Sequence, residues 1–155
     1  MEKLRMKLIV KRTTVGRTIE LLKIAGHQSD ERMVLWMGRH EGNSVVIEDL
    51  LLPRQKVTRV SIRILPSGMR QIFDEMRSTG RMVAAQVHSH PEEAFHSYTD
   101  DCLAITRHEG AISLVLPNFA LDTNVDSFHR NAVCFRLSKN NEWELTDISE
   151  NLEMR

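Results

Sequence analysis

The chain has 155 residues, 41% of them hydrophobic, a length that suits one domain with a substantial core. Lysine plus arginine and aspartate plus glutamate balance at 21 each, which argues against a nucleic-acid-binding protein, because such proteins usually carry a basic surplus. With 2 cysteines, no apolar run long enough for a membrane helix and no recognisable signal peptide, we expect a cytoplasmic protein that binds neither nucleic acid nor membrane.

Two segments have the hydrophobic spacing of amphipathic helices. Residues 13–25 place apolar side chains on one helical face, and Gly26 is a plausible stop. Residues 67–80 form the clearest helix, with Gly80 where a helix-ending glycine belongs. The apolar stripe of this second helix, interpreted as core packing, consists of Met69, Ile72, Phe73 and Met76.

Strands are predicted around these helices. The predicted strands cover residues 32–38, 44–53, 59–65, 81–90, 111–117, 132–138 and 143–148. Residues 40–43 (HEGN) are read as a turn, and residues 139–142 (KNNE) as the turn of a hairpin. Strands that alternate with helices indicate an α/β domain. Residues 119–131 form the longest stretch without a predicted element, and loops of this length often carry function.

The stretch VHSHPEEAFHSYTDD, residues 87–101, gathers side chains that can bind a metal ion. Alternate residues of a strand share a face, so His88 and His90 project together from the strand end. Ser97 can cap a following helix, which places Asp100 on its first turn as a third ligand. Two imidazoles, one carboxylate and one open position describe a catalytic zinc site rather than a structural one. We therefore predict one Zn²⁺ per chain.

The histidine pair and the Ser-x-x-Asp spacing are each weak evidence for a metal site when considered alone. Two histidines at alternate strand positions are more often incidental than metal-bound, and Ser-x-x-Asp is more often a plain helix cap. Their combination within one short window is more specific. The sequence contains none of the alternative histidine motifs HxHxDH, HxHxH or HExxH.

The window resembles the signature of the JAMM (MPN-domain) metalloproteases, in which a distant upstream glutamate precedes an HS/THP motif, a loop and SxxD. The stretch DERMVLWMG matches the upstream part and identifies Glu31, seven residues before Gly38, as the corresponding glutamate. The resemblance covers nearly the whole chain. It implies an α/β fold, a single MPN (JAMM, cytidine-deaminase-like) domain over residues 1–155, with a central mixed β-sheet flanked by helices.

The loop between His90 and Ser97 has six residues, one fewer than is usual in the family, so two aspartates compete for the third ligand position. Asp100 keeps the S-x-x-D spacing, whereas Asp101 keeps the usual distance from the second histidine. We favour Asp100 because the helix cap couples the serine to it, and Asp101 is then a solvated acid at a helix N-terminus. His96 is interpreted as an exposed loop histidine.

The resemblance implies that Glu31 is the general base and that Ser97 donates a hydrogen bond to the developing oxyanion. For Glu31, the alternative is an exposed acid at a helix–strand junction; for Ser97, it is pure capping. In this family the segment around residues 119–131 can flank the substrate, which makes it a candidate lid.

The expected reaction is hydrolysis of an amide at the C-terminus of a ubiquitin-like modifier or its conjugates, as in a deubiquitinase-like isopeptidase. The segments GAISLVLPNFA, CFRL and NEWEL resemble small bacterial members, which are encoded beside ubiquitin-activating-like and ubiquitin-conjugating-like enzymes, including in antiphage operons. Those enzymes are the expected partners, and the family often forms homodimers. Two other functions compete: a non-catalytic MPN scaffold that binds protein partners, and a hydrolase of small amide-linked metabolites.

Overall fold

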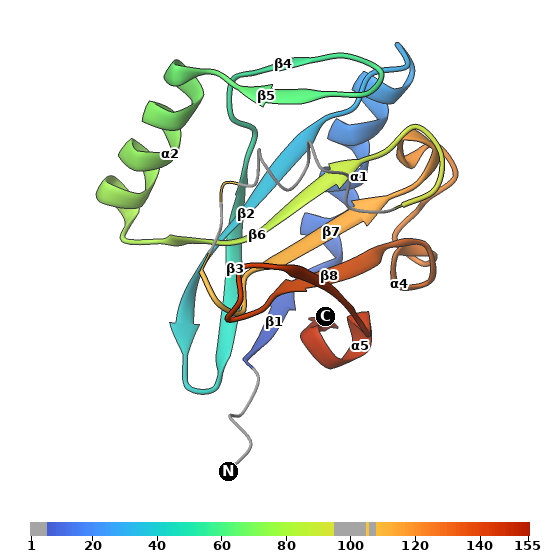
Figure 1. Cartoon of the computed structure of the whole chain (residues 1–155). Coiled ribbons are helices and arrows are strands. Elements are labelled where there is room, and N and C mark those ends of the chain that lie inside the picture. The colour runs from blue at the N-terminus through green and yellow to red at the C-terminus, as the bar shows by residue number, and fades with distance from the viewer. Residues whose placement is uncertain (1–5, 95–104, 106–107) are drawn as a thin grey trace.

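The computed structural model describes residues 6–94, 105 and 108–155, which carry a mixed β-sheet with helices against both of its faces (Figure 1). The described strands are β1 (Lys7–Val10), β2 (Met33–Glu41), β3 (Ser44–Leu51), β4 (Gln55–Val57), β5 (Ile62–Ile64), β6 (Met82–Ser89), β7 (Ile112–Leu116), β8 (Val133–Leu137), β9 (Trp143–Thr146) and β10 (Leu152–Met154). The described helices are α1 (Arg12–Gly26), α2 (Pro66–Thr79), α4 (Phe128–Asn131) and α5 (Ile148–Asn151), with a 3₁₀ turn η1 (Asn118–Ala120). Among these described helices, none is both long and apolar enough to cross a lipid bilayer.

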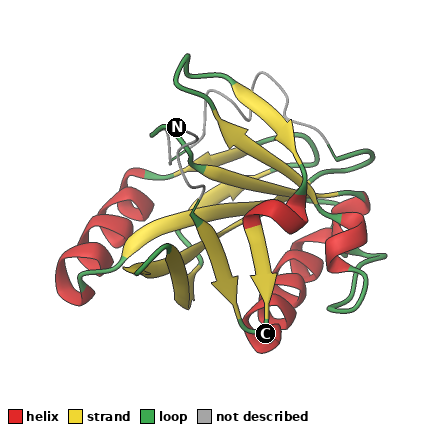
Figure 2. Cartoon of the chain, turned by 90° about the horizontal axis from the view of Figure 1, so that it is seen from below, coloured by secondary structure: helices red, strands yellow, loops and turns green. Residues whose placement is uncertain are grey.

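One sheet holds eight of the described strands in the order β10-β1-β3-β2-β6-β7-β8-β9, and β4 pairs with β5 in a separate hairpin. β1 runs parallel to β3 and β10, and β6 runs parallel to β7, while the other neighbours are antiparallel. The edge strands β9 and β10 are connected through α5, and the sheet is curled (Figure 2). The predicted fold class, α/β with a central mixed sheet flanked by helices, is confirmed.

Strand β2 is covered on both faces, which explains why its apolar run does not alternate. Every residue in Met33–Gly38 is buried. On one face, the Trp36 indole N–H donates a hydrogen bond to Thr18 Oγ1 of α1 at 2.9 Å. On the other face, Leu35 joins a second core that contains Ile72 of α2. The sheet is therefore the middle layer between the two long helices.

The first predicted helix is confirmed as α1, and Gly26 is its last residue, although not as a left-handed helix-ending glycine. The left-handed position is Ser29, with a φ of 58°. The N–H groups of Ser29 and Asp30 donate to the carbonyls of Gly26 and Ala25 at 2.8 and 3.0 Å, a Schellman arrangement. Glycine is needed at position 26 for a steric reason instead: a Cβ there would lie 2.6 Å from the Phe119 carbonyl oxygen, which is too close.

The second predicted helix is confirmed as α2, and Gly80 ends it in the left-handed conformation, with a φ of 74°. Within the predicted apolar stripe, Ile72 is buried, and Met69 and Met76 pack against the second core. Phe73 is 54% exposed, so its assignment to the core is wrong. The apolar stripe is wider than the face that this helix turns toward the sheet.

All of the predicted strands overlap observed ones, namely β2, β3, β5, β6, β7, β8 and β9. The described elements that were not predicted are β1, β4, η1, α4, α5 and β10. β1 and β10 have 4 and 3 residues, and they pair with each other from opposite ends of the chain. Such short strands depend on a distant partner, so local patterning does not reveal them.

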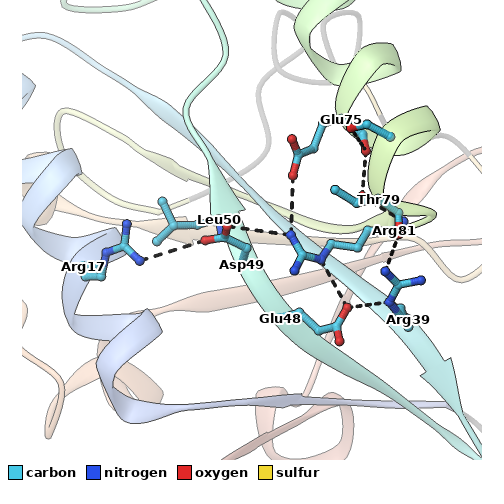
Figure 3. Close-up of polar contacts among 9 residues, drawn as sticks. Arg17, Arg39, Glu48, Asp49, Leu50, Glu75, Thr79 and Arg81 are labelled. Atoms are coloured by element: carbon cyan, nitrogen blue, oxygen red, sulfur yellow. Dashed lines mark hydrogen bonds and ion pairs between the residues drawn. The ribbon is translucent and has the colours of Figure 1, made fainter.

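An ion-pair cluster joins β3 to the connection between α2 and β6 (Figure 3). The Arg81 guanidinium lies 3.2 Å from Glu48 Oε1 and 3.5 Å from Glu75 Oε1. Arg39 donates to the same Glu48 carboxylate at 2.7 Å, and also to the Thr79 carbonyl. The hydrogen bonds from Arg81 and then Arg39 lower the pKa of Glu48 below its ordinary value. The cluster therefore ties the C-terminal end of α2 to the sheet.

The Cys134 thiol is expected to resist alkylation in the folded protein. Burial raises the pKa of this thiol to about 12. At pH 8, about one molecule in 10⁴ would then carry the reactive thiolate. The measurement is iodoacetamide labelling followed by mass spectrometry in a Cys102→Ser variant, because Cys102 lies outside the described residues. The same variant in urea is the control, and equally fast labelling of the native and unfolded protein would contradict the prediction.

Candidate active site

The central strand β6 carries His88 near its end and leads directly into His90. In the sheet, His88 is in register with Met33 of β2 on one side and Val115 of β7 on the other. The exposed fractions of His88 and His90 are 1% and 7%, and their ring centroids lie 6.3 Å apart. Two imidazoles are thus buried close together at the end of a strand that is paired on both sides.

The main chain of His90 is held by the end of β7 and the segment that follows it. The His90 N–H donates to the Leu116 carbonyl at 2.8 Å, and the His90 carbonyl accepts from the Phe119 N–H at 2.7 Å. One residue further on, the Glu92 carbonyl accepts from the Asn118 N–H at 3.0 Å. These bonds fix the backbone just beyond the point where β6 ends.

Glu31 lies between α1 and β2 and is 1% exposed. Its N–H donates to the Thr58 carbonyl in the β4–β5 hairpin at 2.9 Å, and its Oε1 lies 3.9 Å from His90 Nε2. The alternative of an exposed acid at this junction is therefore wrong. A fully buried glutamate is rare in proteins unless it has a partner or a function. The structure brings this carboxylate to the histidine pair from a distant part of the sequence.

Ser89, between the two histidines, holds the two segments together, which sequence reasoning did not predict. Its N–H donates to the Arg32 carbonyl at 3.1 Å, and its Oγ accepts from the Arg32 N–H at 3.0 Å. Ser89 is fully buried. Because Arg32 follows Glu31 in the chain, this pair of bonds aligns the carboxylate with the end of β6. The only feature of the sequence that could have indicated this role is a small hydroxyl residue between two candidate ligands.

The remaining predicted site residues, Ser97 and Asp100, lie outside the described residues, as do Asp101 and His96. Among the described residues there is no group of three histidine, cysteine, aspartate or glutamate side chains with the geometry of a metal site. The donors that are described, two buried imidazoles with a carboxylate nearby, are chemically suited to a first-row divalent ion. The choice between Asp100 and Asp101 stays a prediction.

The candidate lid, residues 119–131, begins within η1 and ends in α4, and it packs into the protein. Phe119 is 6% exposed and Phe128 is fully buried. Asn118, Phe119 and Ala120 all have positive φ angles, of 53°, 54° and 63°. Left-handed backbone costs roughly 1–2 kcal/mol for a residue with a side chain, although asparagine tolerates it better. The buried contacts of this segment offset that strain. That it acts as a lid stays a prediction.

A further contact joins this segment to the β4–β5 hairpin. The Arg59 guanidinium, at the tip of the β4–β5 hairpin, lies 5.9 Å from the Phe119 ring centroid and 4.0 Å from Glu92 Oε1. Both the Arg59 and the Glu92 side chains are mostly exposed, so the ion pair contributes little to stability. By contrast, a cavity of about 640 Å³ lies beside Met82 at the opposite end of β6, away from these residues.

The fold and the buried histidine–glutamate cluster define an α/β protein with a candidate hydrolytic site at the end of a central strand. A scan against models of known protein families finds no match. The chain is 32% identical over 126 residues to a protein of Sinorhizobium fredii (strain NBRC 101917 / NGR234) named "Probable metalloprotease y4jG", and the alignment covers 79% of this chain and 76% of the relative. This chain therefore belongs to the same family as that rhizobial protein.

The fold is also similar to the solution structure of protein DSY2949 from Desulfitobacterium hafniense, with a TM-score of 0.68. The two chains are 14% identical, and the likeness covers 96% of this chain and 92% of the other. At this identity the comparison concerns the fold alone.

Proposed function

We propose that the protein is a metal-dependent peptidase of the JAMM type, a zinc isopeptidase that cleaves amide bonds at the C-terminus of a ubiquitin-like modifier or its conjugates. The observation that carries the proposal is the buried Glu31 carboxylate, 3.9 Å from His90 Nε2 at the end of the strand that also carries His88. The name of the rhizobial relative supports a metalloprotease. The resemblance of the HSHP and SYTD segments supports the JAMM type.

His88, His90 and Asp100 are the proposed ligands of one zinc ion. When bound, zinc would make hydroxide available near neutral pH and polarise the scissile carbonyl. Glu31 accepts the proton of the attacking water and later delivers it to the leaving amine, which general acid–base catalysis requires of a group within hydrogen-bonding reach. Its burial withholds this carboxylate from bulk solvent, and Ser97 donates a hydrogen bond to the oxyanion.

The proposed substrate class is a ubiquitin-like protein with an extended C-terminal tail, free or joined to lysine. The support comes from the similarity of the later segments to bacterial relatives encoded with ubiquitin-activating-like and ubiquitin-conjugating-like enzymes. An antiphage role follows from the same similarity, and those enzymes are the proposed partners. An extended tail can pair with an exposed strand edge, a mode of recognition that uses main-chain hydrogen bonds.

The test is cleavage of a ubiquitin-like protein with a C-terminal extension, compared with a panel of small amides. We expect the zinc-loaded protein to release the extension at the modifier's C-terminus, as read by intact mass, and a chelator to stop the reaction. Cleavage of the small amides alone would instead identify a metabolite hydrolase. Zinc-independent binding of the modifier, with no cleavage of either substrate, would identify a scaffold and overturn the proposal.

A further inference from the structure

The left-handed turn of residues 118–120 contacts both segments that carry the candidate catalytic groups. Three consecutive residues with side chains adopt positive φ here, and Phe119 and Ala120 are buried. Such strained backbone persists only where the surrounding structure over-determines it, and it clusters at functional sites. The turn contacts His90 on one side and the end of α1, which leads to Glu31, on the other.

The first direction is toward His90. The Phe119 N–H donates to the His90 carbonyl at 2.7 Å, and the His90 N–H in turn donates to Leu116, just before the turn. Both main-chain polar groups of His90 are therefore bound by the segment that contains the turn. A change in the path of that segment would move the imidazole with the backbone that carries it.

The second direction is toward Glu31. The Phe119 carbonyl oxygen lies so close to Gly26 that a Cβ at this position would be 2.6 Å away. From Gly26 the Schellman bonds of Ser29 and Asp30 lead directly to Glu31, whose N–H is bound by the Thr58 carbonyl. The end of α1 thus lies against the backbone of the turn, and main-chain hydrogen bonds connect it to the start of β2.

We propose that residues 118–120 are a positioning element that sets the separation between the Glu31 carboxylate and the His90 imidazole. The left-handed path is the one that presents the Phe119 N–H to His90 while its carbonyl abuts Gly26. The catalytic consequence of this role rests on the function proposed above, whereas the geometric role does not.

The test introduces the missing Cβ through Gly26→Ala, with Gly16→Ala as the matched control in the same helix. A Cβ at Gly16 meets its nearest neighbour, Val125 Cγ2, at 3.4 Å, so this change leaves the backbone in place. In crystals of the metal-free Gly26→Ala protein, we expect the Glu31–His90 separation to change by about 1 Å. In the zinc-loaded enzyme, kcat should fall about 100-fold with KM retained, and the Co²⁺ spectrum should shift.

A folded Gly26→Ala protein with the separation and the Co²⁺ spectrum of the wild type would overturn the proposal. If that variant does not fold, Asn118→Val replaces it, because a β-branched residue disfavours the φ of 53° and position 118 is exposed, so the new side chain meets no core. An unchanged separation in a folded Asn118→Val protein would then overturn the proposal. A wild-type protein that binds no divalent ion would refute the proposed function, while the crystal separation would still decide the positioning role.

Discussion

Glu31→Gln is expected to lower turnover by about 100-fold or more while the protein keeps its metal ion. Glutamine is nearly isosteric, so the buried position beside His90 stays filled, but an amide cannot take the proton of the attacking water. General acid–base catalysis by a positioned side chain contributes about 10²–10⁴-fold, and kcat should fall by that factor. The measurement pairs steady-state cleavage of the modifier fusion with metal analysis of the same sample.

The matched control for this substitution is Glu20→Gln on the exposed side of α1, which should leave both kcat and metal content unchanged. Activity of Glu31→Gln within a few-fold of the wild type would remove Glu31 as the base. Loss of metal together with activity would instead make this carboxylate a ligand. The two readouts therefore separate the proton-transfer role from coordination.

His88→Ala is expected to abolish zinc binding. His88 is 1% exposed on a strand that pairs with β2 and β7, and alanine removes the imidazole nitrogen that would bind the ion. The zinc content should fall from about one ion per chain to near zero. A site-specific ion also stabilises the wild type, by about 2.7 kcal/mol at 100 times the dissociation constant, and this gain should vanish in the variant.

Zinc content after chelation and reconstitution, together with thermal unfolding with and without zinc, measures both effects. His27→Ala is the control, because His27 is exposed beyond the end of α1 and belongs to no predicted site. The same zinc stoichiometry in His88→Ala and the wild type would show that the ligand assignment is wrong. Stability that is independent of zinc in the wild type would point to adventitious binding.

The local patterns predicted most of the regular elements because each depends on neighbours in the chain. The stripe of residues 67–80 indicates a helix because residues three and four apart share a face. Alternation places His88 and His90 on a strand end in the same way. Prediction failed where contacts with a distant part of the chain determine the structure. The parallel pair β1 and β10 and the exposed Phe73 are the two examples.

The strongest single contribution of the tertiary structure is the environment of Glu31. In the sequence this residue is an acid before an apolar run, which is compatible with full exposure. The antiparallel pairing of β2 with β6 and the Arg32–Ser89 bonds bring it beside His90. The left-handed turn at Phe119 escaped prediction for a similar reason, since strained backbone is maintained by the contacts around it.

The donor groups, and the placement of both histidines at one strand end, can be read from the residues alone, since side-chain alternation is a property of the local backbone. That a carboxylate from another segment is buried 3.9 Å from one of those imidazoles emerges only in the folded chain. A separation between distant segments is set by strand pairing, helix ends and close backbone contacts taken together. No window of neighbouring residues contains that information.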